Sequence, residues 1–132
     1  AQKVKIHIQS ALLEMDSEIV FRSLPANSQE NYDSIIFSLP TIEKTQAILA
    51  NLKEHGIGTK NIPDALKWHF AGNWEHIFEN HPLYEDCFET TWPNSEELLS
   101  RSIALPVMIS WGEEQLDAYI DKLKRCFLGA LV

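Results

Sequence analysis

Apolar residues recur at strand-like intervals in the N-terminal part of the chain, where they predict two strands. Residues 18–24 (EIVFRSL) and 33–39 (DSIIFSL) are rich in β-branched and aromatic side chains. Pro25 and the polar residues 26–31 separate them, as in a hairpin. We therefore expect the two strands to pair antiparallel.

Helical signals follow directly. Thr41 can cap a helix by accepting a hydrogen bond from an early backbone N–H, and Gly56 can end it because glycine tolerates the left-handed conformation. A second helix is predicted to begin at Asn94, since residues 94–97 (NSEE) have the spacing of a capping box. Its expected apolar side consists of Leu98, Leu99 and Ile103.

The last helix has the clearest pattern. Ser110 or Gly112 is expected at its N-cap. Its apolar positions recur with the helical period and define one buried face, which consists of Leu116, Tyr119, Ile120, Leu123 and Phe127.

In three shorter stretches the pattern of apolar residues does not decide between a strand and another structure. Residues 3–13 fit both a strand and a helix, and the pattern alone leaves both open. Residues 57–60 are short enough for an edge strand, and 105–109 (LPVMI) predict a strand or an extended connection. Together the elements predict an α+β fold, a small antiparallel sheet with helices packed on one face. The 132 residues are expected to form a single domain.

Composition narrows the function classes. With a net charge of −8, the chain lacks the clustered Lys and Arg that bind nucleic-acid phosphates. No apolar run approaches membrane-spanning length and no signal peptide is evident, so we expect no membrane partner. Cys87 and Cys126 have neither metal-ligand spacing nor an evident disulfide framework, which favours a reducing cytoplasm. The chain begins at Ala1 within an element, which is typical of a truncated or processed protein.

The densest polar and aromatic segment spans residues 57–78, and there we expect a site or an interface. A core segment would have fewer polar residues, and a surface loop fewer aromatic ones. The spacing between His69 and His76 is not that of a helical zinc pair, so no metal site is predicted. The candidate binding residues of the segment are Lys60, Trp68, His69, Asn73, Trp74 and His76.

Three features of the chain together carry a family resemblance. The first is the unit that runs from residues 33–40 (DSIIFSLP) to 56–60 (GIGTK), and the second is the His-containing aromatic loop after it. The third is the tail 93–127, with a Pro-led helix, a Leu-Pro step and an acidic start to the closing helix. These features resemble the DegT/StrS family of pyridoxal-phosphate (PLP) sugar aminotransferases. The stretch 58–77 (GTKNIPDALKWHFAGNWEHI) is more similar to one branch, the 8-amino-3,8-dideoxy-octulosonate transaminases, which make an amino form of the lipopolysaccharide sugar Kdo.

The resemblance implies a fold-type I PLP enzyme of which this chain is only the C-terminal, small domain. Such enzymes hold PLP mainly on a large N-terminal domain that carries the Schiff-base lysine. No lysine here stands in a motif of that kind, so the resemblance implies no catalytic residue in this chain and leaves its cofactor contacts unknown. Residues 1–13 would be the end of the helix that joins the two domains.

For the site, the resemblance implies that Lys60 and His69 orient a sugar substrate. Lys60 stands where many members have Arg, and Gly112 stands where they often have Thr or Ser. Trp68 and Trp74 would stack on the sugar or fill the groove between domains. The plainer interpretations of Lys60 and His69 are a solvated lysine at a strand end and a packed histidine.

The resemblance also implies a function for the complete enzyme. It would transfer an amino group, from glutamate as the expected donor, to a keto- or aldehyde-sugar such as an oxidised Kdo, in cytoplasmic lipopolysaccharide biosynthesis. Family members are commonly homodimers. From the residues alone, a second interpretation stays open: a non-catalytic module that binds a ligand or a protein through residues 57–78. A domain that docks on a larger one should expose an apolar patch around Trp68, Trp74 and the first helix.

Overall fold

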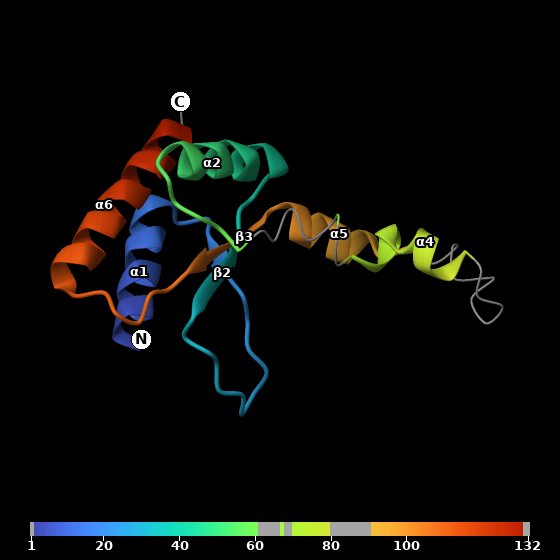
Figure 1. Ribbon diagram of the computed structural model, residues 1–132, viewed down its shortest axis with the longest axis horizontal. Coiled ribbons are helices and arrows are strands. Elements are labelled where there is room, and N and C mark those ends of the chain that lie inside the picture. Colours follow the sequence, from blue (N-terminus) through green and yellow to red (C-terminus); the bar gives the residue numbers. More distant parts are fainter. Residues whose placement is uncertain (1, 61–66, 68–69, 80–90, 131–132) are drawn as a thin grey trace.

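The computed structural model describes residues 2–60, 67, 70–79 and 91–130. In chain order, the elements are α1 (Gln2–Met15), β1 (Val20–Phe21), β2 (Ser34–Ser38), α2 (Ile42–Glu54), η1 (Ala71–Asn73), α4 (Glu75–Phe78), α5 (Pro93–Ser100), β3 (Ser102–Pro106) and α6 (Glu113–Ala130). Figure 1 shows a body that contains the sheet with α1, α2 and α6, and an arm that contains α5 and α4.

The three strands form an antiparallel sheet in the order β1–β2–β3. On one side of β2, the Arg22 amide donates to the Ile36 carbonyl (3.0 Å). On the other side, the Leu39 amide donates to the Arg101 carbonyl (2.9 Å). Ile36 and Leu39 are three residues apart and so bond to opposite neighbours, as an antiparallel ladder requires. The predicted antiparallel pairing of the first two strands is confirmed.

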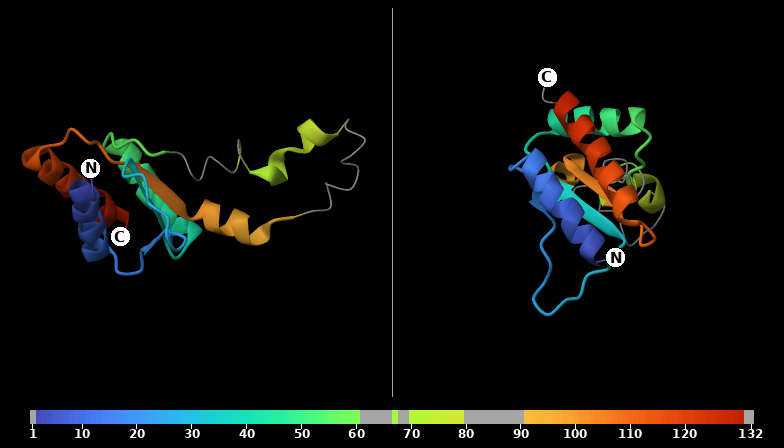
Figure 2. Two further views of the ribbon diagram at one scale, coloured as in Figure 1. Left: turned by 90° about the horizontal axis from the view of Figure 1, so that it is seen from below. Right: turned by 90° about the vertical axis from the view of Figure 1, so that its left-hand side faces the viewer.

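One face of the sheet is covered by α1, α2 and α6, as the views in Figure 2 show. Ile35 and Phe37 of β2 point into this helical layer and are at most 1% exposed. The helices supply most of the remaining core, chiefly Ile8, Leu12, Ile48, Leu52, Ile120, Leu123 and Phe127. The predicted α+β fold, with helices packed on one face of a small antiparallel sheet, is therefore confirmed.

Both predicted ends of α2 are confirmed. The Thr41 hydroxyl accepts a hydrogen bond from the Lys44 amide at 3.2 Å and so satisfies one of the free donors of the first turn. The Thr45 hydroxyl donates to the Thr41 carbonyl at 2.8 Å. After the helix, Gly56 has a φ of 68°, the left-handed conformation that ends helices at low cost only with glycine.

The N-terminal stretch, whose pattern left a strand and a helix open, is helical. Its buried residues Ile8, Ala11 and Leu12 recur with the helical period and face the core. Lys5 is also buried, and its ammonium group pairs with Glu30 and lies 5.9 Å from the centroid of the Tyr32 ring. This pair ties α1 to the long connection between β1 and β2.

The strand predictions need three corrections. β1 covers only Val20–Phe21 of the predicted 18–24, because pairing with β2 stops where the chain turns away to Pro25. Residues 57–60 form no strand, since a single backbone bond, from the Lys60 amide to the Ala104 carbonyl (2.8 Å), joins them to β3. β3 itself is Ser102–Pro106 rather than 105–109, and Ile103 belongs to this strand and not to the preceding helix.

The predicted capping box at Asn94 is wrong. The helix α5 begins at Pro93 with Trp92 at the N-cap, and no side chain caps it. Proline favours the first helical position because its fixed φ suits the helix and its missing N–H is not needed there. Glu97 therefore does not reach back to the start of the helix, and instead pairs with Arg101 at 2.6 Å.

The closing helix α6 follows its predicted pattern. Leu116, Ile120, Leu123 and Phe127 are buried, and Cys126 joins them. Its start is organised by Gly112, whose amide donates to the Gln115 side chain at 2.8 Å and whose carbonyl accepts from Leu116 at 3.0 Å. Of the two predicted caps, the structure thus favours Gly112.

The half-buried Tyr119 lies on the same helix, with its ring centroid 4.4 Å from that of Trp111. Among the helices that the structure describes, none has the length and hydropathy needed to cross a bilayer.

Candidate functional site

Lys60 is held beside the sheet by its backbone and paired through its side chain. Its amide donates to the Ala104 carbonyl of β3 at 2.8 Å, and its ammonium group donates to the Asp33 carboxylate at 2.9 Å. The Ser34 hydroxyl donates to the other carboxylate oxygen of Asp33 at 3.0 Å. The side chains of Lys60 and Asp33 stay 45% and 48% exposed. We call Lys60, Asp33 and Ser34 the Lys60 cluster.

The electrostatics of this cluster leave it open to a ligand. The hydrogen bond from Lys60, and after it the one from Ser34, holds the pKa of Asp33 below its ordinary value of 3.8. Water screens an exposed pair of this kind, so the pair contributes little to stability and can be exchanged at low cost. A ligand carboxylate or hydroxyl could accept from Lys60 while Asp33 accepts from a second hydroxyl.

Three of the predicted site residues lie on the arm. Asn73 ends η1 and is exposed, Trp74 is half-buried between η1 and α4, and His76 is exposed on α4. Figures 1 and 2 place α4 at the far end of the arm from the sheet. The structure thus does not bring Asn73, Trp74 and His76 together with Lys60. Trp68 and His69 lie outside the described residues, so their roles stay predictions.

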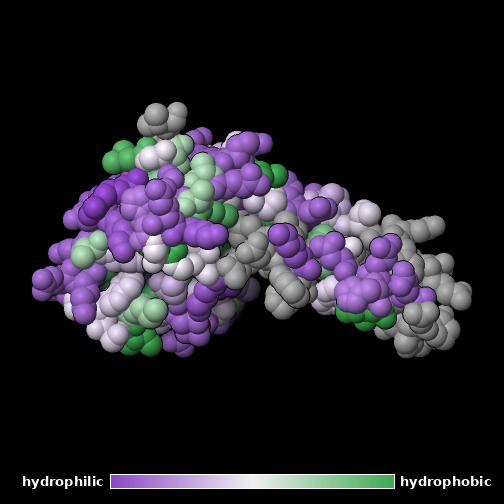
Figure 3. All heavy atoms as spheres, turned by 45° about the horizontal axis from the view of Figure 1, so that its top comes forward, coloured by the Kyte–Doolittle hydropathy of each residue, from purple (hydrophilic) through white to green (hydrophobic). Residues whose placement is uncertain are grey.

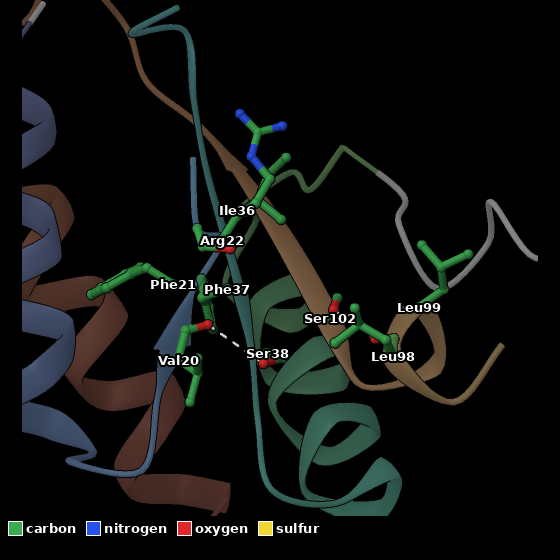
Figure 4. Close-up of a pocket in the computed structure, with 10 residues that line it drawn as sticks. Val20, Phe21, Arg22, Ile36, Phe37, Ser38, Leu98, Leu99 and Ser102 are labelled. Carbon is green, nitrogen blue, oxygen red and sulfur yellow. Dashed lines mark hydrogen bonds between the residues drawn. The ribbon is translucent and has the colours of Figure 1, made fainter. Parts of the chain in front are cut away.

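A groove of about 400 Å³ lies on the face of the sheet opposite the helical layer. Figure 4 shows its walls, with β1 and β2 on one side and the C-terminal end of α5 on the other. Val20 is 63% exposed and Leu98 49%, although both are apolar. The groove is lined by Val20, Phe21, Arg22, Ser23, Ile36, Phe37, Ser38, Leu98, Leu99 and Ser102. We call this side of the sheet the open face.

The helical layer has the opposite surface character. In Figure 3, where the top of the molecule comes forward, the surface of the body is mainly hydrophilic. The exposed positions of α2 and α6 are indeed mostly charged or amide side chains. On α1, Ile6 and Leu13 are 53% and 44% exposed. Trp74 lies on the arm and Trp68 outside the described residues, so the structure does not show the single apolar patch expected around both tryptophans and the first helix.

The open face was missed by the sequence interpretation, although the sequence holds a signal for it. In β2, apolar residues stand at adjacent positions, with Ile36 between Ile35 and Phe37. Neighbouring strand residues point to opposite faces of a sheet. Apolar residues on both faces of a strand predict that the second face of the sheet is also covered. That argument identifies Ile36 from the sequence, whereas Val20 joins the same face only through the register of β1 with β2, in which it pairs with Ser38.

The described lysines do not fit PLP attachment. A lysine that forms a Schiff base needs an ammonium group that is desolvated and can lose its proton. Lys5 is buried but pairs with Glu30, Lys44 pairs with Asp16, and Lys60 pairs with Asp33. The other described lysines are exposed. In the part of the chain that the structure describes, no lysine is both buried and without a carboxylate partner.

No family model matches this chain. The resemblance to the DegT/StrS enzymes therefore stays a prediction from the motifs that carry it. Among residues 2–60, 67, 70–79 and 91–130, no three His, Cys, Asp or Glu side chains converge as metal ligands.

Proposed function

We propose that this chain is the small domain of a PLP-dependent sugar aminotransferase of the DegT/StrS type and is inactive alone. One observation carries the proposal: the sheet has helices on one face and an apolar groove on the other. A domain that docks through its sheet onto a larger domain needs that arrangement, because the apolar side chains of the open face lose their contact with water on docking.

In the proposed enzyme, PLP supplies the electron sink for amino transfer and is held by the larger domain. The small domain contributes substrate contacts. Lys60 donates to a carboxylate or hydroxyl group of a keto- or aldehyde-sugar, and His69 is a second donor. Glutamate is the proposed amino donor, and the proposed setting is cell-surface polysaccharide synthesis in the cytoplasm by a homodimer.

The first test is the size of the polypeptide that carries this sequence in its source cell. Peptide mass mapping after a denaturing gel should find tryptic peptides upstream of Ala1, together with a PLP-modified lysine on borohydride reduction. A native product of the present length, with no attached PLP, would overturn the proposal.

A second test addresses the site. In the longer polypeptide, Lys60→Ala should raise the KM for the sugar about tenfold, as expected for the loss of one charged hydrogen bond. Lys53→Ala, at an exposed position of α2, is the matched control. Unchanged kinetics in Lys60→Ala and His69→Ala together would remove both residues from the substrate site.

The groove also favours a second candidate, a non-catalytic binding module. Its volume of about 400 Å³ lies in the range of small-molecule sites. The sequence places the contact of such a module in residues 57–78, but none of the described residues of that segment lines the groove. It predicts ligand binding by the isolated chain without PLP, and chemical-shift mapping with a sugar-acid series would locate the contact.

A further inference from the structure

The outer edge of β1 leaves backbone groups without a partner among the described residues. Arg22 bonds to β2 through its amide, and by alternation so does Val20, so the amide and carbonyl of Phe21 point outward. The other edge of the sheet is different, because the Ala104 carbonyl of β3 already accepts from the Lys60 amide at 2.8 Å. The β1 edge is therefore available to a further strand.

The side chains beside this edge indicate which residues an added strand should have. Val20 and Arg22 alternate with Phe21, so both belong to the open face, and both line the groove. Arg22 takes part in none of the ion pairs found within residues 2–60, 67, 70–79 and 91–130. Figure 4 shows its guanidinium group extending past Ile36, away from Leu98. The apolar side chain of Val20 and the cation of Arg22, which forms none of these ion pairs, thus lie two residues apart on the same face of the sheet.

We propose that an extended protein segment adds to the sheet along β1, with an apolar residue opposite Val20 and an acidic residue opposite Arg22. Opposed residues on one face of a sheet are two positions apart, so the partner carries an apolar and an acidic residue with one residue between them. Its main chain bonds to Phe21, and its apolar side chain enters the groove.

A second copy of this chain fits the edge less well. If two β1 strands paired antiparallel about Phe21, Arg22 of each copy would stand opposite Val20 of the other. Pairing about Val20 would bring Glu18 opposite Arg22, but the Ile19 amide that this register needs already donates to the Asp16 carbonyl at 3.3 Å. Each copy also carries a net charge of −8, which opposes self-association. Charge complementarity therefore favours an acidic segment of another protein or domain.

The test is an NMR titration of the 132-residue chain with a peptide of about eight residues, alternating Thr and Val, in which Glu stands two positions from a central Val. The matched peptide has Lys in place of Glu. We expect shifts of the Val20, Phe21 and Arg22 amides, slower solvent exchange at Phe21, and about fivefold weaker binding of the Lys peptide. Arg22→Glu should reverse the preference, and unchanged shifts in α1 and α6 would show that this variant keeps its fold.

Three results would overturn the proposal: no binding at millimolar peptide, shifts confined to the helical layer, or equal binding of the Glu and Lys peptides. Concentration-dependent shifts of the β1 amides without peptide would assign the edge to a second copy and would overturn it as well. None of these results bears on the aminotransferase proposal, whose test is the size of the natural polypeptide and its PLP lysine.

Discussion

The two faces of the sheet use the same strands but differ in what covers them. On the face toward the helices, Ile35 and Phe37 are at most 1% exposed. On the open face, Val20 remains 63% exposed and Ile36 is half-buried. Toward β3 the same face is covered, since Ser38, Ser102 and Ala104 are at most 7% exposed. Neighbouring residues of a strand place their side chains on opposite faces of the sheet, so Ile36 lies on the other face from Ile35 and Phe37.

The comparison of the two faces distinguishes the residues that stabilise the fold from those that remain available to bind a partner. The helical layer buries the large side chains whose transfer out of water drives folding. The open face adds little to the isolated chain and keeps apolar surface available for a partner. We therefore expect substitutions on the covered face to change the free energy of unfolding, and substitutions on the open face to change binding.

The largest expected effect is on the covered face. Phe37 contacts the rings of Phe21 and Phe127, each with its centroid 6.4 Å away. Phe37→Ala should lower the free energy of unfolding by about 3–5 kcal/mol, measured by urea denaturation. Its neighbour provides the control: Ile36→Ala should cost only about 1 kcal/mol because the side chain is half-buried. Equal losses would mean that both faces are covered to the same degree.

A smaller loss of stability is expected when the buried ammonium group of Lys5, on α1, is removed. Lys5→Met keeps the packing of the aliphatic stem but leaves the Glu30 carboxylate, 26% exposed, without its partner. The expected loss is about 2 kcal/mol, below the usual figure for a buried pair since Glu30 reaches water. Adding Glu30→Gln should recover at least part of that loss. A double variant with fully additive losses would show that the pair is not coupled.

On the open face, polar substitutions should change surface properties more than stability. Val20→Ser and Leu98→Ser should change the free energy of unfolding by no more than about 0.5 kcal/mol each. Both should reduce the fluorescence of a hydrophobic dye bound to the folded chain. Ile109→Ser is the control, because Ile109 is 72% exposed but does not line the groove. The comparison breaks down if this control reduces the dye signal as much as the open-face variants do.

The smallest effect concerns the Lys60 cluster. The pKa of the Asp33 carboxyl lies below 3.8 in the folded chain, so the stabilisation from its ionised form is present above about pH 4 and is lost as the pH falls through the folded-state pKa. Lys60→Met removes the main cause and should raise the pKa of Asp33 toward 3.8 in an NMR titration of its carboxyl carbon. An unmoved pKa would mean that Ser34, rather than Lys60, controls this carboxyl group.

Sequence reasoning predicted the covered side better than the rest. The periodicity of Leu116, Ile120 and Leu123 predicts a buried face because only a helix places those positions together. The Thr41 cap and the Gly56 stop are equally local. The capping box at Asn94 is wrong because two local signals compete there, and the proline at position 93 prevails.

The candidate site was less predictable. Lys60 was singled out through the family resemblance, but its partner Asp33 is 27 residues away in the chain. No local pattern joins such residues. Asn73, Trp74 and His76 share a segment with Lys60, yet the arm carries them away from it (Figure 1).

By itself the sequence determined α2 with its Thr41 cap and its Gly56 stop, the buried face of α6, and the central strand. These follow from interactions within a few residues, which periodicity and capping chemistry report directly. The tertiary structure decided the helical state of residues 3–13, the extent of β1 and β3, and the pairing of Lys60 with Asp33. It also decided which face of the sheet the helices cover and which face the described residues leave partly exposed, because that depends on where distant helices pack.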